Sequence, residues 1–351
     1  MPDNKRILIT GSNGYIGSVM APWFQNQGYD VVGLDTGYFA HCTLVPDVAK
    51  VPTISRDIRD ITARDLDGYD AIIHLAALSN DPIGNLNEAW TTEINLHGTS
   101  LLATAARQAR VPRFIFSSSC IMYGMSEAAV VDETAPLAPR TEYARSKAAA
   151  EASLSHLADD QFSPTFCRNG TIYGLSPRMR FDTVLNNLMG EAFTTGEVVI
   201  HSDGTPWRPV VHVQDVARAF QAVLEAPREL VHNQAFNTGA DDLNHQIKQL
   251  GQIVAETVPG CKLSIVPQAG ADQRTYQADF GKFKRTFEDF RFLWTVREGA
   301  VELRTAFERC GLTHAQFTDK RFTRLSWLRH LLDHGTLVGS LRWNQPQRQV
   351  A

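Results

Sequence analysis

Two side chains that can move a proton lie four residues apart near the middle of the chain. Tyr143 and Lys147 fall in Tyr-Ala-Arg-Ser-Lys, within a pattern that predicts a helix over 142–158. Residues four apart project from one face of a helix, so an ammonium group would lie beside a phenol. That charge lowers the pKa of the phenol toward neutrality, where Tyr143 can act as a base. Ser119 is expected to hold the same substrate oxygen. Taken alone, the pair is also compatible with an ordinary surface Tyr and Lys on an alanine-rich helix.

A glycine-rich loop near the N-terminus indicates a second chemical function. A strand expected over 6–10 leads into Gly11-Ser12-Asn13-Gly14-Tyr15-Ile16-Gly17, which opens a helix. Gly11 permits the tight turn, Gly14 lets backbone N–H groups approach a diphosphate, and Gly17 lets the helix pack close on the strand. A glycine turn without a ligand has the same composition, but the strand–loop–helix context favours a dinucleotide site that includes Tyr15 and Ile16.

A carboxylate follows at the end of the second expected strand, 30–34. Asp35 lies roughly 20 residues beyond the glycines, where an acidic side chain accepts the adenosine ribose hydroxyls and repels a 2′-phosphate. No arginine occupies 36–39, where a group that reads the 2′-phosphate of NADP would be expected. The sequence therefore favours NAD, with Asp35 and Thr36 at the ribose.

Short apolar runs alternate with helical stretches in the first half, which is typical of βαβ units on a parallel sheet. Continuous apolar character fits strands that helices cover on both faces. Strands are expected at 6–10, 30–34, 71–75, 113–117 and 164–168, and helices at 17–27, 87–108, 142–158, 213–224, 245–257, 295–309 and 321–332. The helix at 213–224 is expected to pack back on the first domain. The fold class expected is α/β, a Rossmann-type doubly wound parallel sheet with a smaller, discontinuous C-terminal α/β substrate lobe.

The expected domain division follows from this pattern. Residues 1–173, with 207–232, would form the cofactor-binding domain, and 174–206 with 233–351 would form the substrate lobe.

Composition excludes several function classes. The 351 residues include 34 Lys and Arg against 38 Asp and Glu, which argues against a nucleic-acid-binding surface. No apolar run reaches the roughly 20 residues of a membrane span, and no secretory signal precedes the first strand. The five cysteines are scattered without a C-x-x-C pair, so neither disulfides nor a metal site is expected, and the cytoplasm is the natural compartment.

With these motifs in place, the chain resembles the extended short-chain dehydrogenase/reductase family, and within it the nucleotide-sugar epimerases and dehydratases. The glycine loop, Asp35 and the Tyr143/Lys147 pair after a serine run carry the resemblance. It implies NAD as cofactor, a nucleotide-diphosphate sugar as substrate, and a homodimer. The further cofactor contacts that it implies are Asp57, Ile58, Leu75, Ala76, Ala77, Asn95 and Ser117, besides Tyr143 and Lys147.

The second half is similar to UDP-galactose 4-epimerases. Trp207-Arg208-Pro209-Val210-Val211-His212-Val213-Gln214-Asp215 resembles their R-x-x-x-H-V-x-D pattern, in which Arg208 would pair with the substrate diphosphate. Arg274 occupies the place of a second nucleotide-binding arginine. The substrate contacts that the resemblance implies are Ser79, Ser119, Thr171, Asn187, Leu188, Arg208 and Arg274.

Departures from the family pattern bear on the reaction. Sugar 4,6-dehydratases carry Asp-Glu after the active-site Ser or Thr, whereas this chain has Cys120 and Ile121. Isoleucine cannot move a proton, so a dehydratase or decarboxylase is disfavoured. Cys120 follows Ser119 on a strand and would face the opposite side, so we interpret it as a packing residue. Thr171 stands where the epimerases usually have Asn, which leaves the identity of the sugar open.

Two reactions fit this sequence. The first is an NAD-dependent epimerase acting at C4 of a nucleotide sugar through a transient 4-keto intermediate. The second is an NAD(P)H-dependent 4-ketoreductase of a nucleotide deoxysugar pathway. A 4,6-dehydratase and a non-catalytic NAD-binding regulator are disfavoured.

Overall fold

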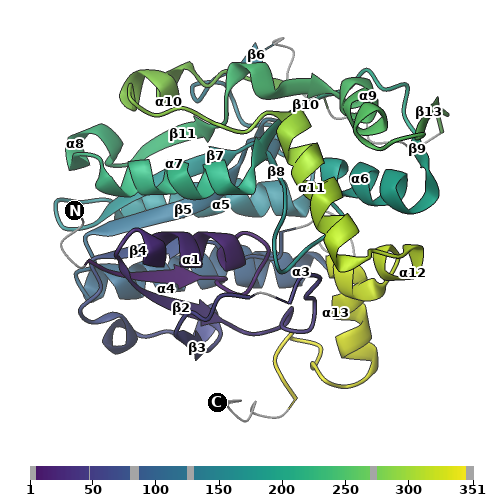
Figure 1. Cartoon of the computed structure of the whole chain (residues 1–351). Coiled ribbons are helices and arrows are strands. Elements are labelled where there is room, and N and C mark those ends of the chain that lie inside the picture. The colour runs from purple at the N-terminus through teal and green to yellow at the C-terminus, as the bar shows by residue number, and fades with distance from the viewer. Residues whose placement is uncertain (1–4, 47, 80–86, 125–129, 269–274, 345–351) are drawn as a thin grey trace.

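The computed structural model describes residues 5–46, 48–79, 87–124, 130–268 and 275–344. A parallel sheet of seven strands, in the order β11-β7-β5-β4-β1-β2-β3, forms the centre of the molecule (Figure 1). Its strands are β1 (Arg6–Thr10), β2 (Asp30–Asp35), β3 (Thr53–Ser55), β4 (Ala71–His74), β5 (Arg113–Ser119), β7 (Ser163–Asn169) and β11 (Gln234–Thr238). Successive strands are added outward from β1 to β2 and β3 on one side, and from β4 to β5 and β7 on the other side. In a doubly wound sheet, the ligand-binding crevice lies at the point where this order changes direction, here between β1 and β4. The expected Rossmann-type fold is confirmed.

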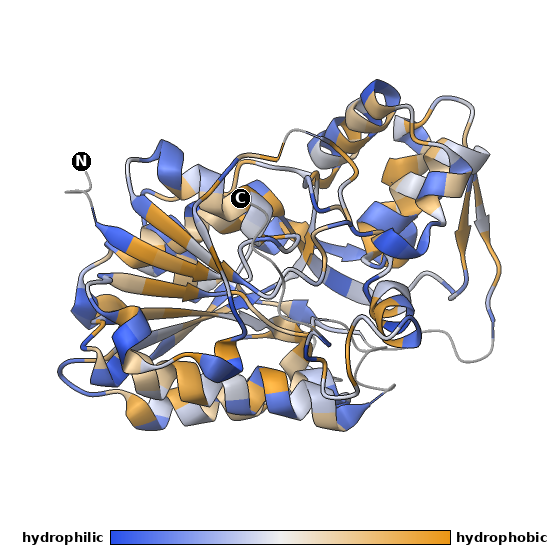
Figure 2. Cartoon of the chain, turned by 90° about the horizontal axis from the view of Figure 1, so that it is seen from below, coloured by the Kyte–Doolittle hydropathy of each residue, from blue (hydrophilic) through white to orange (hydrophobic). Residues whose placement is uncertain are grey.

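Helices cover both faces of the sheet, as the continuous apolar strands predict (Figure 2). Along β1, Ile7 and Ile9 pack into one core and Leu8 into the other. One face carries α1 (Gly17–Asn26), α7 (Val213–Glu225) and α10 (Gly281–Thr286), and the opposite face carries α4 (Thr99–Gln108) and α5 (Glu142–Leu157). The expectation that 213–224 packs back on the first domain is therefore confirmed.

The stretch expected as one helix over 87–108 has an interruption. It consists of α3 (Glu88–Thr91), a π-helical segment η3 (Thr92–Gly98) and α4. A π-helical turn inserts an extra residue into the helix and shifts the phase of side chains around it, a feature often found near functional sites.

The remaining elements form the second lobe and the links to the sheet. A separate core unites α6 (Val184–Thr195), α9 (Ile247–Thr257) and α11 (Val296–Cys310). The small sheets are β12 (Asn244–Gln246), β10 (Trp207–His212) and β8 (Thr171–Tyr173); β13 (Lys262–Ile265) with β9 (Glu197–Ile200); and β14 (Gln277–Ala278) with β6 (Val130–Val131). The short helices are η1 (Ile58–Asp60), η2 (Ala63–Leu66), η4 (Cys120–Tyr123), α8 (Arg228–Val231), η5 (Asp241–Leu243), α12 (His314–Phe317) and η6 (Lys320–Phe322).

Three elements from the range 233–351 lie with the sheet rather than with this lobe. β11 is the edge strand beside β7, α10 packs next to it, and α13 (Arg324–Asp333) places Trp327 and Leu328 in the core of the sheet. Their short apolar segments carry no local mark of this placement, which follows from tertiary packing alone. The division into domains stays a prediction, with these three elements reassigned.

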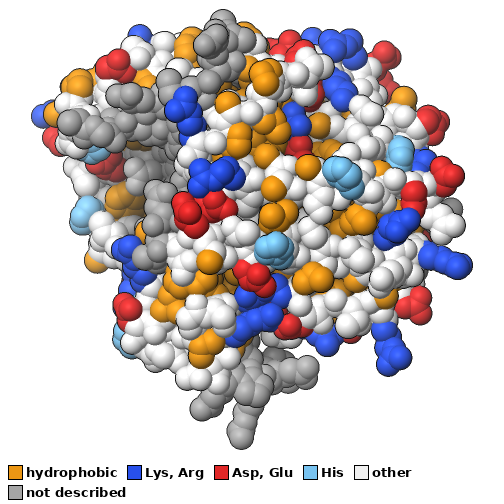
Figure 3. All heavy atoms as spheres, turned by 180° about the vertical axis from the view of Figure 1, so that it is seen from behind, with side chains coloured by type: hydrophobic (Ala, Val, Ile, Leu, Met, Phe, Trp, Pro, Cys, Tyr) orange, Lys and Arg blue, Asp and Glu red, His pale blue; other side chains and the backbone are white. Residues whose placement is uncertain are grey.

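Charges are mixed on the surface. On the face shown in Figure 3, Lys and Arg side chains are interspersed with Asp and Glu side chains. The near balance of positive and negative charges in the composition therefore also holds on this face. Among the described residues, the helices are all too short or too polar to span a membrane.

Candidate functional site

A cavity of about 960 Å³ lies at the carboxyl ends of the central strands, where the strand order reverses. It brings together most of the residues predicted from the sequence. Those on its wall are Gly11, Gly14, Tyr15, Ile16, Gly17, Asp35, Thr36, Asp57, Ile58, Leu75, Ala76, Ala77, Ser79, Ser117, Ser119, Tyr143, Lys147, Thr171 and Arg208.

The glycine loop is shaped by close approach of backbone to backbone. Gly11 has φ +73°, and a Cβ there would lie 2.8 Å from the Ala76 nitrogen. A Cβ on Gly17 would lie 2.2 Å from the Gly11 oxygen. Only glycine fits at either position, so the loop stays tight and the N-terminus of α1 faces the cavity, where it favours a diphosphate.

Asp35 is held at the end of β2 by backbone donors. Its Oδ2 accepts from the Asn13 nitrogen at 2.9 Å, and its Oδ1 accepts from the Gly37 nitrogen at 2.7 Å. Burial raises the pKa of Asp35, while these two N–H groups act in the opposite direction. The carboxylate keeps acceptor capacity for the predicted ribose, and its negative charge would oppose a 2′-phosphate there.

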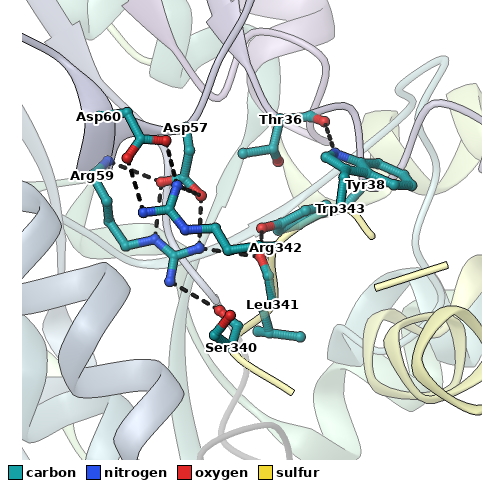
Figure 4. Close-up of polar contacts among 9 residues, drawn as sticks. All are labelled: Thr36, Tyr38, Asp57, Arg59, Asp60, Ser340, Leu341, Arg342 and Trp343. Carbon is teal, nitrogen blue, oxygen red and sulfur yellow. Dashed lines mark hydrogen bonds and ion pairs between the residues drawn. The ribbon is translucent and has the colours of Figure 1, made fainter. Parts of the chain in front are cut away.

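The C-terminal strap, residues 335–344, is bound to residues at the end of the cavity that is predicted to hold adenosine (Figure 4). Trp343 donates from Nε1 to the Thr36 oxygen at 2.7 Å, and Tyr38 donates to the Leu341 oxygen. Arg342 pairs with Asp57 at 3.2 Å between Nη1 and Oδ2. The strap therefore fixes the residues predicted to contact the ribose and adenine.

Asp57 itself is already engaged by its neighbours. It caps η1, accepting from the Arg59 nitrogen at 2.9 Å, and pairs with the Arg59 guanidinium at 2.7 Å. Arg59 in turn donates to the Ser340 oxygen at 3.0 Å. Asp57 thus links the adenine side of the cavity to the strap.

The His74-Leu75-Ala76-Ala77 segment owes its position to the buried imidazole. His74 Nδ1 lies 2.6 Å from Thr10 Oγ1, and its Nε2 lies 2.8 Å from Thr99 Oγ1. Burial, reinforced by the charge of Lys147, lowers the pKa of His74 to about 3, so the ring is neutral. The side chain joins β1, β4 and α4 and holds the backbone at Ala76 against the glycine loop.

The Tyr143 and Lys147 pair lies on the cavity wall, on the first turns of α5. Lys147 Nζ lies 6.0 Å from the centre of the Tyr143 ring and donates to the Ser117 oxygen at 2.7 Å. It also lies 4.5 Å from the centre of the Phe116 ring. Burial lowers the pKa of Lys147 to about 7, with Glu151 acting in the opposite direction. The ammonium is thus poorly solvated, and a nearby anion would stabilise it.

Ser119, the last residue of β5, lies on the cavity wall with Ile121, whereas Cys120 does not. Cys120 begins the short helix η4, so the expectation that it continues the strand is wrong, and the turn of η4 rather than strand alternation directs it away. Ser119 Oγ accepts from the Ile121 nitrogen at 3.3 Å, which leaves its hydroxyl proton to donate. Cys120 is fully buried in a small apolar cluster, and burial raises the pKa of its thiol. The interpretation of Cys120 as a packing residue is confirmed.

Several predicted residues lie elsewhere. Asn95, in η3, accepts from the Leu78 nitrogen at 2.8 Å and donates to Ser146 Oγ at 3.2 Å, so it ties the loop after β4 to α5 behind the wall. Arg274 lies outside the described residues.

The predicted pair Asn187 and Leu188 is not on the cavity wall either. Helix α6 turns Asn186 inward, where it donates to the Tyr15 hydroxyl at 3.1 Å. Asn187 is consequently exposed, and Leu188 packs in the core of the second lobe. The phase of the helix, set by Asn186, decides which side chain points inward.

The structure adds cavity residues that the sequence pattern does not single out. Asn169, at the end of β7, donates to Ser117 Oγ at 3.2 Å, and its Oδ1 is buried without a partner among the described residues. Arg180 and Asp182 pair at 2.5 Å, and Arg180 donates to Ser79 Oγ at 3.1 Å. Arg324, from α13, completes this side of the wall. The two arginines of the segment 178–180 are the only feature of the sequence that could have indicated these cavity residues.

A profile of the NAD-dependent epimerase/dehydratase family matches residues 7–239, more than half of the chain. The chain belongs to this family. Membership confirms both the resemblance stated above and NAD as the expected cofactor.

Relatives with different reactions match this family member to a similar degree. UDP-glucose 4-epimerase of Corynebacterium glutamicum is 26% identical over 321 residues, covering 86% of this chain and 94% of its own. Human dTDP-D-glucose 4,6-dehydratase is 28% identical over 269 residues, covering 72% and 75%. The structure of MoeE5 in complex with UDP-glucuronic acid and NAD is 26% identical, with a TM-score of 0.75 over 87% of this chain and 99% of that one. The chain is therefore a nucleotide-sugar epimerase/dehydratase family member, and the reaction has to be argued from its own site.

Proposed function

We propose that this protein is an NAD-dependent epimerase that inverts C4 of a nucleotide-diphosphate sugar through a transient 4-keto intermediate. The observation that carries the proposal is Ile121 on the cavity wall beside Ser119. Elimination of water from the sugar needs an additional acid and base next to the reacting carbons. An alkyl side chain at this place supports a reaction that exchanges hydrogen at a single carbon.

The acidic groups on the described part of the wall support the same conclusion. Asp35 and Asp57 lie at the adenosine end and are bound to backbone N–H groups and to guanidinium groups. Asp182 is paired with Arg180. Burial alone would raise the pKa of Asp182, but the guanidinium of Arg180 helps to hold it below its ordinary value. A carboxylate that a guanidinium keeps ionised is a poor proton donor, which supports the same conclusion for Asp182.

Bound NAD supplies an acceptor, and then a donor, for the hydride of the sugar C4. Tyr143 takes the proton of the 4-hydroxyl while the hydride leaves, and returns it when the hydride comes back to the other face. Lys147 stabilises the phenolate, and Ser119 donates a hydrogen bond to the same oxygen. Arg208 holds the diphosphate, so the keto sugar turns about a fixed anchor; its cavity position supports this role.

The residues present fit the cofactor. Gly11, Gly14 and Gly17 keep three positions of the loop free of Cβ atoms, Asp35 is preset by two backbone donors, and Lys147 lies on the wall of the same cavity. Asn169 Oδ1 offers an acceptor with no partner in the described residues.

The test is turnover of a panel of UDP-, dTDP- and GDP-sugars by the purified protein without added nicotinamide. Interconversion of C4 epimers is expected. Tyr143→Phe should abolish it, while Tyr29→Phe, a buried tyrosine away from the cavity, should not. Turnover only of 4-keto sugars with added NADH or NADPH would replace this proposal with a 4-ketoreductase. Full activity of Tyr143→Phe would refute both.

A further inference from the structure

A buried arginine from the C-terminal region enters the cofactor cavity. Arg324 is 3% exposed and lies on the cavity wall, although it belongs to α13, beyond the part of the chain that matches the family profile. Its Nη2 donates to the Arg178 oxygen at 2.7 Å, and its guanidinium carbon lies 4.5 Å from the centre of the Phe39 ring. Its Nη1 is buried with no partner among the described residues. A buried charged donor without an acceptor is costly, so an acceptor is expected to occupy this position in the working protein.

The charges around Arg324 leave a positive excess in the described part of the site. Three guanidinium groups, those of Arg178, Arg180 and Arg324, face the carboxylates of Asp182 and Asp35. Burial, with a further effect from Arg180, lowers the pKa of Arg324 to about 10, so it remains cationic at neutral pH. The missing acceptor is therefore expected to be an anion.

The neighbours of Arg324 indicate which anion. Phe39, on which it stacks, follows the ribose-reading Asp35 on the loop after β2. Arg324 also interacts electrostatically with Tyr15 of the glycine loop. Burial raises the pKa of Tyr15, and the positive charge of Arg324 acts in the opposite direction. Arg324 thus lies on the cavity wall together with Asp35, at the predicted adenosine ribose, and Tyr15 of the glycine loop. The diphosphate of a dinucleotide has to cross the interval between that ribose and the glycine loop.

The C-terminal region holds Arg324 firmly in this place. The Arg324 nitrogen donates to Asp182 Oδ2 at 3.1 Å, and Trp327 donates from Nε1 to the Tyr38 oxygen at 2.6 Å. The strap beyond α13 is bound in turn to Thr36 and Asp57 (Figure 4). A guanidinium fixed in advance loses little freedom when its ligand arrives, which favours tight binding.

We propose that Arg324 is a ligand of the cofactor diphosphate, which it binds through Nη1 from the side opposite the glycine loop. The glycine loop supplies neutral backbone donors, and Arg324 supplies the formal charge. The C-terminal region is then part of the cofactor site, and the diphosphate lies between α1 and α13. This inference concerns binding alone and does not depend on which sugar reaction the protein catalyses.

The test compares Arg324→Gln and Arg324→Lys with Arg329→Gln, which removes an exposed arginine from the same helix. For the full-length proteins, we would measure the NAD retained on purification, and the dissociation constants of NAD, ADP-ribose, adenosine and UDP by calorimetry after removal of bound nucleotide. Loss of one charge-assisted hydrogen bond corresponds to about 10- to 100-fold weaker binding. Arg324→Gln is expected to weaken the binding of NAD and ADP-ribose by this factor, and Arg324→Lys is expected to weaken it less. Neither variant should change the binding of adenosine or UDP, and Arg329→Gln should bind all four ligands as wild type does.

The outcomes that overturn the proposal are distinct from failure of the epimerase reaction. Unchanged affinity for NAD and ADP-ribose would refute it. Weaker binding of UDP alone would assign Arg324 to the substrate diphosphate instead. An equal loss for adenosine and ADP-ribose would show a structural effect on the whole adenosine site. If Arg324→Gln does not fold, Arg324→Lys decides by the same comparison, because it keeps the charge but loses the planar fork.

Discussion

The buried Lys147 should make the stability of the cofactor-free protein depend on pH. Burial lowers the pKa of Lys147 to about 7 from 10.5. Between these values the unfolded chain carries a proton that the folded chain has released. The free energy of unfolding therefore rises with pH in this interval, by up to about 1.4 kcal/mol per pH unit. From pH 6 to pH 9 the rise works out at about 2 to 3 kcal/mol, and at pH 6 the full desolvation cost of the charge is present.

Lys147→Met removes this contribution while keeping the volume of the side chain. The change of the Lys147 hydrogen bond to the Ser117 oxygen on deprotonation is already included in the pKa shift, so the rest of the cost of the substitution does not depend on pH. The difference in unfolding free energy between wild type and Lys147→Met should therefore grow in favour of wild type by about 2 to 3 kcal/mol from pH 6 to pH 9.

The assay is urea unfolding of both proteins, freed of bound nucleotide, at several values between pH 6 and pH 9. Lys262→Met, which changes an exposed lysine on β13, serves as the control and should follow wild type. The remaining titrating groups are common to both proteins and cancel in the difference. Parallel pH profiles for wild type and Lys147→Met would refute the claim that Lys147 is held in a desolvated state.

Three further changes test other parts of the site. Asp35→Ser removes the carboxylate that opposes a 2′-phosphate, so the ratio of the NADP to the NAD dissociation constant should fall about tenfold or more; an unchanged ratio would show that other groups select the cofactor. Arg168→Met breaks the buried pair with Glu151, which joins Nη2 and Oε2 at 2.7 Å, and should lower the free energy of unfolding in urea by about 3 to 5 kcal/mol; a loss near zero would mean that Glu151 finds another partner. Trp343→Ala removes the hydrogen bond of the strap to the Thr36 oxygen, which contributes about 1 kcal/mol, so this variant should release NAD several times faster in stopped-flow displacement. An unchanged release rate would exclude a role of the strap in retaining NAD.

The sequence by itself determined the parts of the site that depend on short spacings. The glycine loop, Asp35 and the Tyr143/Lys147 pair lie at the ends of single elements, where the period of a helix or the order strand–loop–helix settles the direction of a side chain. All of them lie on the cavity wall, as predicted.

Only the tertiary structure decided the rest. Asn187 was expected at the substrate but is exposed, because contacts of Asn186 with Tyr15 and Gly174 set the rotation of α6. Arg324 meets Asp182, a residue 142 positions away, through a docking of α13 that no local pattern records. Spacing along the chain settles geometry within one helix or loop. The partners of a buried charge depend on how separate elements pack, and in this protein that packing brings the C-terminal arginine to the cofactor cavity.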